Sequence, residues 1–118
     1  MKGRVAVSWG ALAVLAFAGL AYAHHGWSSY DEDRTVTASG PVEEVHFEHP
    51  HATVRVRAED RAWLVVLPPP TRAVALGLSA DVLRPGTRVV AVGHPHRREA
   101  GEMRALRISV RDRTFRLR

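Results

Sequence analysis

The sequence predicts a small, mainly β barrel of five to six strands with one short helix, preceded by a signal peptide. Short segments that alternate apolar and polar residues, the period of a half-buried strand, recur through residues 35–118. Clusters of Pro, Gly and Asp separate these segments, and one segment of helical character lies between the third and the fourth. The first 23 residues differ from the rest because they are mostly apolar.

Residues 1–23 have the three parts of an export signal. Lys2 and Arg4 give a positive start, residues 5–20 contain no charge, and Ala21-Tyr22-Ala23 has the small-x-small pattern of a cleavage site. The alternative is an uncleaved membrane anchor, because the apolar stretch approaches the roughly 20 residues that span a bilayer. The A-x-A pattern favours cleavage, which would make His24 the first residue of a periplasmic or secreted protein.

Cleavage would leave 95 residues with 15 basic and 12 acidic side chains, a formal charge of +3. This length suits one domain with a single core, expected as a monomer without stable membrane insertion. The chain contains no cysteine, which excludes disulfides, a covalent c-type haem and thiolate metal sites. Nitrogen and oxygen atoms must therefore hold any bound metal.

The domain is expected to begin with an arm and a long strand. Residues 24–34 are polar and aromatic without periodicity, which indicates an extended N-terminal arm. Residues 35–47 predict the first strand of a barrel domain that covers residues 35–118. Within this strand, Gly40-Pro41 and the adjacent Glu43-Glu44 indicate a bulge or a bend.

Two strands and a helix should follow. Residues 52–58 alternate cleanly and predict a second strand, while the apolar run at residues 61–67 predicts a third that is buried on both faces. Pro68-Pro69-Pro70 ends the third strand because proline donates no ladder hydrogen bond. A short helix is expected next, with Thr71 as its N-cap and Gly77 as its stop.

Further strands complete the predicted barrel. The fourth covers residues 87–93, the fifth covers residues 103–110, and a terminal strand turns Phe115 and Leu117 inward. One face of the fifth strand is expected to carry Leu106, Ile108 and Val110. Three strands, a helix and two further strands is the element order of the OB-fold, a small, partly open Greek-key barrel; another small barrel or a sandwich is the alternative.

Histidines occur in the two loops that matter most for this fold. In an OB-fold, the loops between strands 1 and 2 and between strands 4 and 5 flank one binding face. These loops carry His-Pro-His triplets at residues 49–51 and 94–96, which are therefore expected to approach each other. Imidazole is the commonest protein ligand for zinc, copper and nickel, so a shared metal site is predicted. For one triplet alone, a solvated loop is the simpler interpretation, and His46 is expected to face solvent or Glu44.

The paired histidines of the arm add a second source of ligands. A free N-terminal amine titrates near pH 7.7 to 8.0, so His24 could offer a metal both its amine and its ring nitrogen. His25 could instead use its ring with the amine and the intervening backbone nitrogen, which suits tetragonal copper(II). The alternative is a solubilising leader in which Trp27 and Tyr30 only pack on the barrel. The predicted metal ligands are His24, His51, His25, His94 and His96.

Parts of the sequence resemble a family of short exported bacterial proteins of unknown function. The similarity begins with residues 24–31, HHGWSSYD, includes residues 47–52, FEHPHA, and continues to Gly93, so it covers nearly the whole mature chain. Its most specific elements are the mature His-His opening and the (Asn/His)-Pro-His run. Asparagine commonly precedes the proline in that family, so the resemblance ranks His51 above His49, while the second triplet matches only some members. The resemblance implies an exported small β-barrel and supplies no activity.

The predicted function is a metal-binding module for copper or zinc that serves sequestration or delivery. The alternative is a metal-free module that binds an anionic ligand or a protein partner through Arg55, Arg57, Arg104 and Arg107. A zinc hydrolase with Glu48 as base is a remoter hypothesis, since nothing indicates a substrate pocket and no catalytic residue is predicted. Nucleic acid is not expected as a ligand, because few aromatic residues are present to stack bases.

Overall fold

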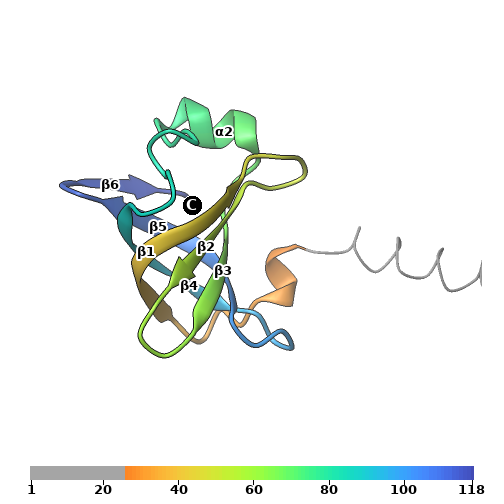
Figure 1. Cartoon of the computed structure of the whole chain (residues 1–118). Helices are drawn as coiled ribbons and strands as arrows, with labels where there is room; N and C mark the ends of the chain where they lie inside the picture. Colours follow the sequence, from red (N-terminus) through yellow and green to blue (C-terminus); the bar gives the residue numbers. More distant parts are fainter. Residues whose placement is uncertain (1–25) are drawn as a thin grey trace, which may run out of the picture.

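The computed structural model describes residues 26–118, which fold into a closed barrel with one helix at its end (Figure 1). The prediction of a small, mainly β barrel of five to six strands with one short helix between the third and fourth strands is confirmed. The elements in chain order are the 3-10 turn η1 (Trp27–Ser29), the strands β1 (Val36–His46), β2 (Thr53–Arg57) and β3 (Ala62–Val66), the helix α2 (Pro70–Ala75), and the strands β4 (Arg88–Pro95), β5 (Glu102–Val110) and β6 (Arg113–Arg116).

The barrel closes through a parallel pair of strands. Antiparallel pairing gives the order β3-β2-β1-β4-β5, and β3 then pairs with the first part of β5 to complete the ring. β6 is an additional strand that pairs with the second part of β5, from Arg107 to Val110. In the part of the chain that the structure describes, no helix is long and apolar enough to cross a bilayer.

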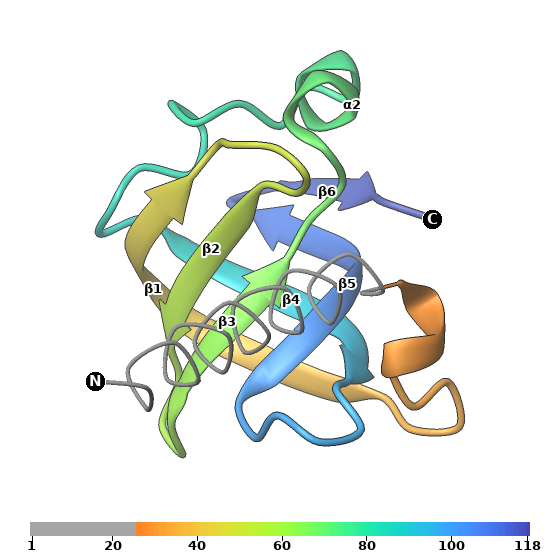
Figure 2. The ribbon, with the colours of Figure 1, turned by 90° about the vertical axis from the view of Figure 1, so that its right-hand side faces the viewer.

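The alternating pattern of the sequence becomes the barrel core. Val54, Val56 and Val65 point inward and are fully buried, as the period of 2 in β2 and β3 requires. Helix α2 covers one end of the barrel, away from the loop between β4 and β5 (Figures 1 and 2). Its buried Ala73 belongs to the same core cluster, so the helix closes the apolar interior at that end.

The helix begins earlier than the sequence suggests. Its first residue is Pro70 and its N-cap is Pro69, which makes no side-chain capping hydrogen bond, so the expectation that Thr71 is the N-cap is wrong. Proline is well suited to the first helical position, because its missing N–H has no partner there and its φ is already near the helical value. Leu76 ends the helix, and Gly77 follows with a φ of 92°.

Two bulges bend the long strands. In β1 the register with β2 shifts between Val42 and Glu44, close to the predicted Gly-Pro bend. In β5 the pairing with β4 shifts so that Leu106 is the extra residue, which corrects the prediction that Leu106 shares a face with Ile108 and Val110. Because a bulge inserts one residue, it reverses the inward and outward alternation along the strand.

Glycine is required where the bulged strands approach each other. A Cβ atom on Gly93 would collide with the backbone carbonyl of Arg104, and one on Gly40 would collide with the carbonyl of Arg57. Both glycines are buried in strands, where no flexible side chain can move aside. The absence of a side chain therefore permits the curvature that closes the barrel.

Gly93→Ala should force β4 and β5 apart at the bulge and lower the free energy of unfolding by about 2 kcal/mol, as overpacking commonly does. Urea denaturation followed by circular dichroism measures this change. Gly26→Ala is the matched control, because nothing lies within 4 Å of its added Cβ atom. Equal unfolding midpoints for the two variants would contradict the steric explanation.

Candidate functional site

The N-terminal arm lies against the loop between β4 and β5. Tyr30 forms an isolated antiparallel bridge with His96. The backbone N–H of Asp31 donates to Pro95 O at 2.9 Å, and that of Arg97 donates to Ser29 O at 2.9 Å. The arm is therefore paired with the barrel by backbone hydrogen bonds, and its Trp27–Ser29 segment forms a 3-10 turn instead of the expected extended chain.

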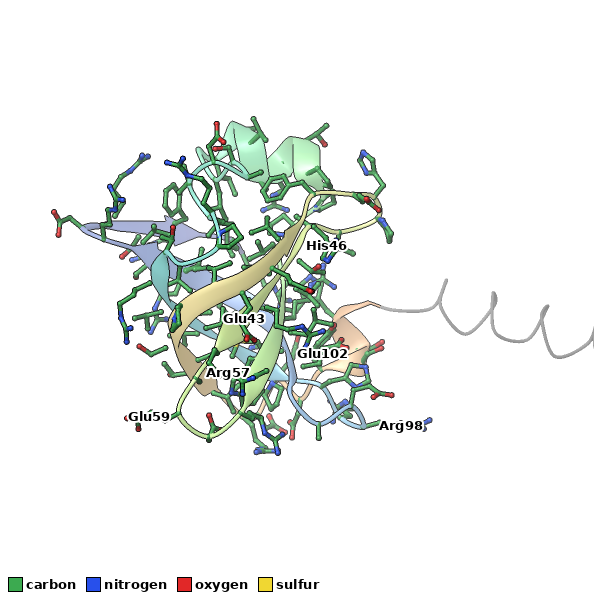
Figure 3. The ribbon with its side chains drawn as sticks, in the orientation of Figure 1. Glu43, His46, Arg57, Glu59, Arg98 and Glu102 are labelled. Carbon is green, nitrogen blue, oxygen red and sulfur yellow. The ribbon has the colours of Figure 1, made fainter. Side chains whose placement is uncertain are left out.

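Tyr30 anchors the arm through a partly buried hydrogen bond. Its ring is 3% exposed and meets the His96 ring edge-on with 5.1 Å between centroids. Its hydroxyl donates to Glu102 Oε2 at 2.6 Å, and Figure 3 shows Glu102 beside the arm. Burial, together with the hydrogen bond to Glu102, raises the pKa of the Tyr30 hydroxyl. Tyr30 is therefore a neutral donor at physiological pH, as expected for a structural anchor.

His51 uses one ring nitrogen, Nδ1, in a hydrogen bond and leaves the other, Nε2, without a proton. Its Nδ1 lies 3.0 Å from the carbonyl oxygen of Leu67, which can only accept, so Nδ1 carries the proton and donates. Nε2 is consequently the nitrogen with a lone pair. Burial, and then the positive charge of Arg104, lowers the pKa of His51, so the ring stays neutral to lower pH than a solvated histidine.

His94, near the C-terminal end of β4, has the same arrangement of ring nitrogens. Its Nδ1 lies 2.6 Å from the carbonyl oxygen of Arg34, so this ring also donates from Nδ1 and leaves the lone pair on Nε2. The indole of Trp27 lies edge-on to it, with 6.5 Å between ring centroids. A hydrogen bond from one ring nitrogen to a backbone carbonyl is typical of histidines that bind metals through the other nitrogen.

His96 has the opposite arrangement. Its Nδ1 accepts hydrogen bonds from the backbone N–H groups of Arg98 and Glu99 at 3.1 and 3.0 Å. Nδ1 is therefore already in use, and the neutral ring carries its proton on Nε2. This geometry shapes the loop between β4 and β5, whose residue Arg98 projects away from the barrel (Figure 3).

Of the other four histidines, two are exposed and two lie outside the described residues. His49 is exposed in the loop between β1 and β2. His46 is exposed near the end of β1, with its Nε2 3.6 Å from Glu44 Oε2, as expected from the sequence (Figure 3). His24 and His25, two of the predicted ligands, lie outside the described residues.

The two triplets flank one side of the barrel without forming a cluster. The His51 ring forms a hydrogen bond with Leu67, the residue after β3. In the sheet, Val66 of β3 is paired with Arg104 of β5, and Arg104 is paired in turn with His94 of β4. Neighbouring strands are about 4.8 Å apart, so β3 and β5 separate the two imidazoles. Within residues 26–118 no group of three or more His, Asp or Glu side chains is placed to hold a metal ion.

A cationic aromatic stack lies between the two histidines. The guanidinium carbons of Arg104 and Arg118 each lie 4.1 Å from the centre of the Trp27 ring. Sequence reasoning included Arg104 in a basic face but did not pair it with Trp27, and it missed Arg118. No spacing in the sequence links these three residues, because the arm, β5 and the segment after β6 are brought together only by the tertiary fold.

A model described as a family of unknown function, DUF6152, matches residues 11–105. The chain belongs to this family. The match covers most of the barrel and most of the loops that carry the histidines, and the description of DUF6152 assigns no activity to them. A search of curated proteins found no match.

Two solved structures match about two thirds of this chain. The complex of TiaS with its tRNA and ATP has a TM-score of 0.51 and 17% identity over 69% of this chain. Apo TiaS, a tRNA agmatidine synthetase, has a TM-score of 0.48 and 16% identity over 68% of this chain. This DUF6152 member spans about a fifth of the length of those chains, 19% and 18% respectively. At 17% identity the similarity to the tRNA complex concerns the fold alone.

The lowered pKa of His51 predicts a particular pH dependence of stability. As the pH falls through about 6.5, the unfolded chain takes up a proton at residue 51 before the folded protein does. The free energy of unfolding should therefore decrease from pH 6.5 down to the lower folded-state pKa. His51→Asn, whose amide can still donate to Leu67 O, should flatten this part of the curve.

Urea titrations in the presence of a chelator, at intervals from pH 7.5 to 5.0, measure this contribution. His49→Asn, an exposed position in the same triplet, is the control and should retain the wild-type slope. Parallel curves for the wild type and His51→Asn would show that burial of residue 51 does not oppose its protonation.

Proposed function

We propose that this protein is an exported module that binds one copper(II) or zinc ion through its N-terminal histidines and one barrel imidazole. The supporting observation is that His51 and His94 both donate from Nδ1 to a backbone carbonyl. Each ring is thereby oriented, and Nε2 is the nitrogen that can bind a metal. The proposal also draws on the free amine that cleavage after Ala23 would create.

The docked arm supports a role for the N-terminal histidines. The Trp27 ring lies 4.1 Å from the guanidinium carbons of Arg104 and Arg118, so the arm is held on the barrel from Trp27 onward. His25 directly precedes Gly26, and two residues of chain span at most about 7 Å. An N-terminal chelate formed by the His24 amine and ring would therefore be tethered to the face that holds His94 and His51.

Of the two barrel imidazoles, His94 is the better partner for such a chelate. Its ring lies 6.5 Å from that of Trp27, which belongs to the arm itself. His51 lies close enough to Arg104 for the guanidinium charge to lower its pKa. The same charge repels a divalent cation, although a low pKa also reduces competition by protons. We therefore place His94 before His51, and leave out His96 because its Nδ1 already accepts two hydrogen bonds.

Export is part of this proposal because the chelate requires a free amine at His24. Protein purified from the periplasm without a chelator should have the intact mass of a chain that begins at His24. Native mass spectrometry of the same sample reports any bound ion. A mass that includes Met1, found in the membrane fraction, would contradict both export and the amine chelate.

Copper binding can be followed through Trp27, because Trp63 is the only other tryptophan after the predicted cleavage site. Copper(II) bound beside His94 should quench the Trp27 fluorescence at a ratio of 1:1. His94→Ala and a variant with one added N-terminal residue should each bind at least about tenfold more weakly, since even the loss of a second-shell partner commonly costs about 10- to 100-fold in affinity.

His49→Ala is the matched control, because residue 49 is an exposed histidine of the first triplet. His51→Ala ranks the second barrel imidazole against His94, and calorimetric titration with zinc tests the other ion. If the trimmed protein, the extended protein and His94→Ala all bind copper and zinc equally weakly, the histidines are not ligands and the proposal is wrong.

A further inference from the structure

We propose that Arg104, Arg118 and Trp27 form a binding site for one small oxyanion group, a carboxylate or a phosphate, that needs no metal. Arg104 is the central residue of the proposed site. It is a half-buried residue of β5, and its guanidinium carbon lies 4.1 Å from the centre of the Trp27 ring. Among residues 26–118 no carboxylate forms an ion pair with it. A partly buried charge without a counter-ion is costly, and a bound anion would reduce that cost.

Burial and the neighbouring charge of Arg118 both disfavour the positive charge of Arg104, which a bound anion would stabilise. Burial lowers the pKa of the Arg104 guanidinium, Tyr30 acts in the opposite direction, and the charge of Arg118 lowers it further. Arg118 is itself paired with Glu32 Oε1 at 3.0 Å, but this pair is exposed and screened by solvent. The Glu32 carboxylate therefore serves Arg118, and Arg104 lacks a comparable partner.

A small groove beside the stack matches the proposed ligand in size. It has a volume of about 50 Å³ and is lined in part by Arg72, Arg104, Arg118, Trp27, Pro68 and Leu117. A single water needs a cavity of about 10 to 15 Å³, so the groove admits a group of a few heavy atoms and not a nucleotide. Three arginines beside an apolar surface suit one oxyanion group attached to a small apolar body.

The contact with the Trp27 ring leaves the N–H groups of Arg104 available to donate to such a ligand. A guanidinium that stacks on an indole uses its planar face, while its N–H groups lie in the plane. The Arg104 side chain has no other hydrogen bond or ion pair among the described residues that would occupy these donors. The planar fork matches two oxygens of a carboxylate or a phosphate, which gives both strength and orientation.

Nuclear magnetic resonance of the two indole N–H groups in the mature, metal-free protein tests the proposal. Sodium acetate and sodium phosphate are the probes, and sodium chloride at matched ionic strength is the reference. One or both probes should shift the Trp27 signal saturably, and the better probe identifies carboxylate or phosphate as the preferred group. The Trp63 indole, which is oriented toward Asp60, should remain unchanged and serves as an internal control.

Two substitutions in β5 distinguish binding at this site from a nonspecific effect of the positive charge of the protein. Arg104→Gln should weaken binding at least tenfold, whereas Arg107→Gln removes the same charge from an exposed position of β5 and should have no effect. If Arg104→Gln does not fold, Arg118→Gln replaces it and should also reduce affinity.

Three outcomes would overturn the proposal: no saturable Trp27 shift with either probe, equal shifts of Trp27 and Trp63, or equal losses in Arg107→Gln and the site variants. Wild-type affinity in Arg118→Gln would likewise remove Arg118 from the site. Because every titration uses metal-free protein, a failure here does not bear on the proposed metal function.

Discussion

The parallel pairing of β3 with β5 is the constraint on which the rest of the molecule depends. Only three residues of each strand take part, from Leu64 with Glu102 to Val66 with Arg104, and Leu64 N–H donates to Gly101 O at 2.7 Å. This short pairing converts an open sheet into a barrel without free edges at the seam. It also decides which residues of distant loops become neighbours, because Arg104 then lies between the end of β3 and His94 of β4.

The docked arm follows from the same closure. Glu102, the first residue of β5 in the parallel pair, accepts the hydrogen bond of the Tyr30 hydroxyl. Pro95 of β4 accepts the backbone hydrogen bond of Asp31, so β5 of the seam and its neighbour β4 both hold the arm. The position of Trp27 beside His94 and Arg104 is thus a consequence of barrel geometry. A chain whose β3–β5 seam did not form would lose the arm and the proposed sites together.

Local pattern predicted the fold well and the site poorly, for physical reasons that particular residues illustrate. Val54 and Val56 alternate with arginines, and strand period alone places them in the core. The sequence did not predict which face of β5 carries Leu106. The bulge that decides it depends on the close approach of Gly93 in the neighbouring strand. The ring orientations of His51 and His94 depend on carbonyl groups 16 and 60 residues away, so no local motif encodes them.

Charge connects the two proposed sites on this face. The positive charge of Arg104 lowers the pKa of the His51 ring, so this histidine and the arginines beside Trp27 are electrostatically coupled. A dication bound near these imidazoles is repelled by Arg104 as long as that charge has no partner, and an oxyanion in the groove offsets the repulsion. Because coupling between two binding sites is reciprocal, a bound cation must then strengthen anion binding by the same factor. The basic groove and the histidines, which taken separately point to opposite ligands, are therefore compatible within one small barrel face.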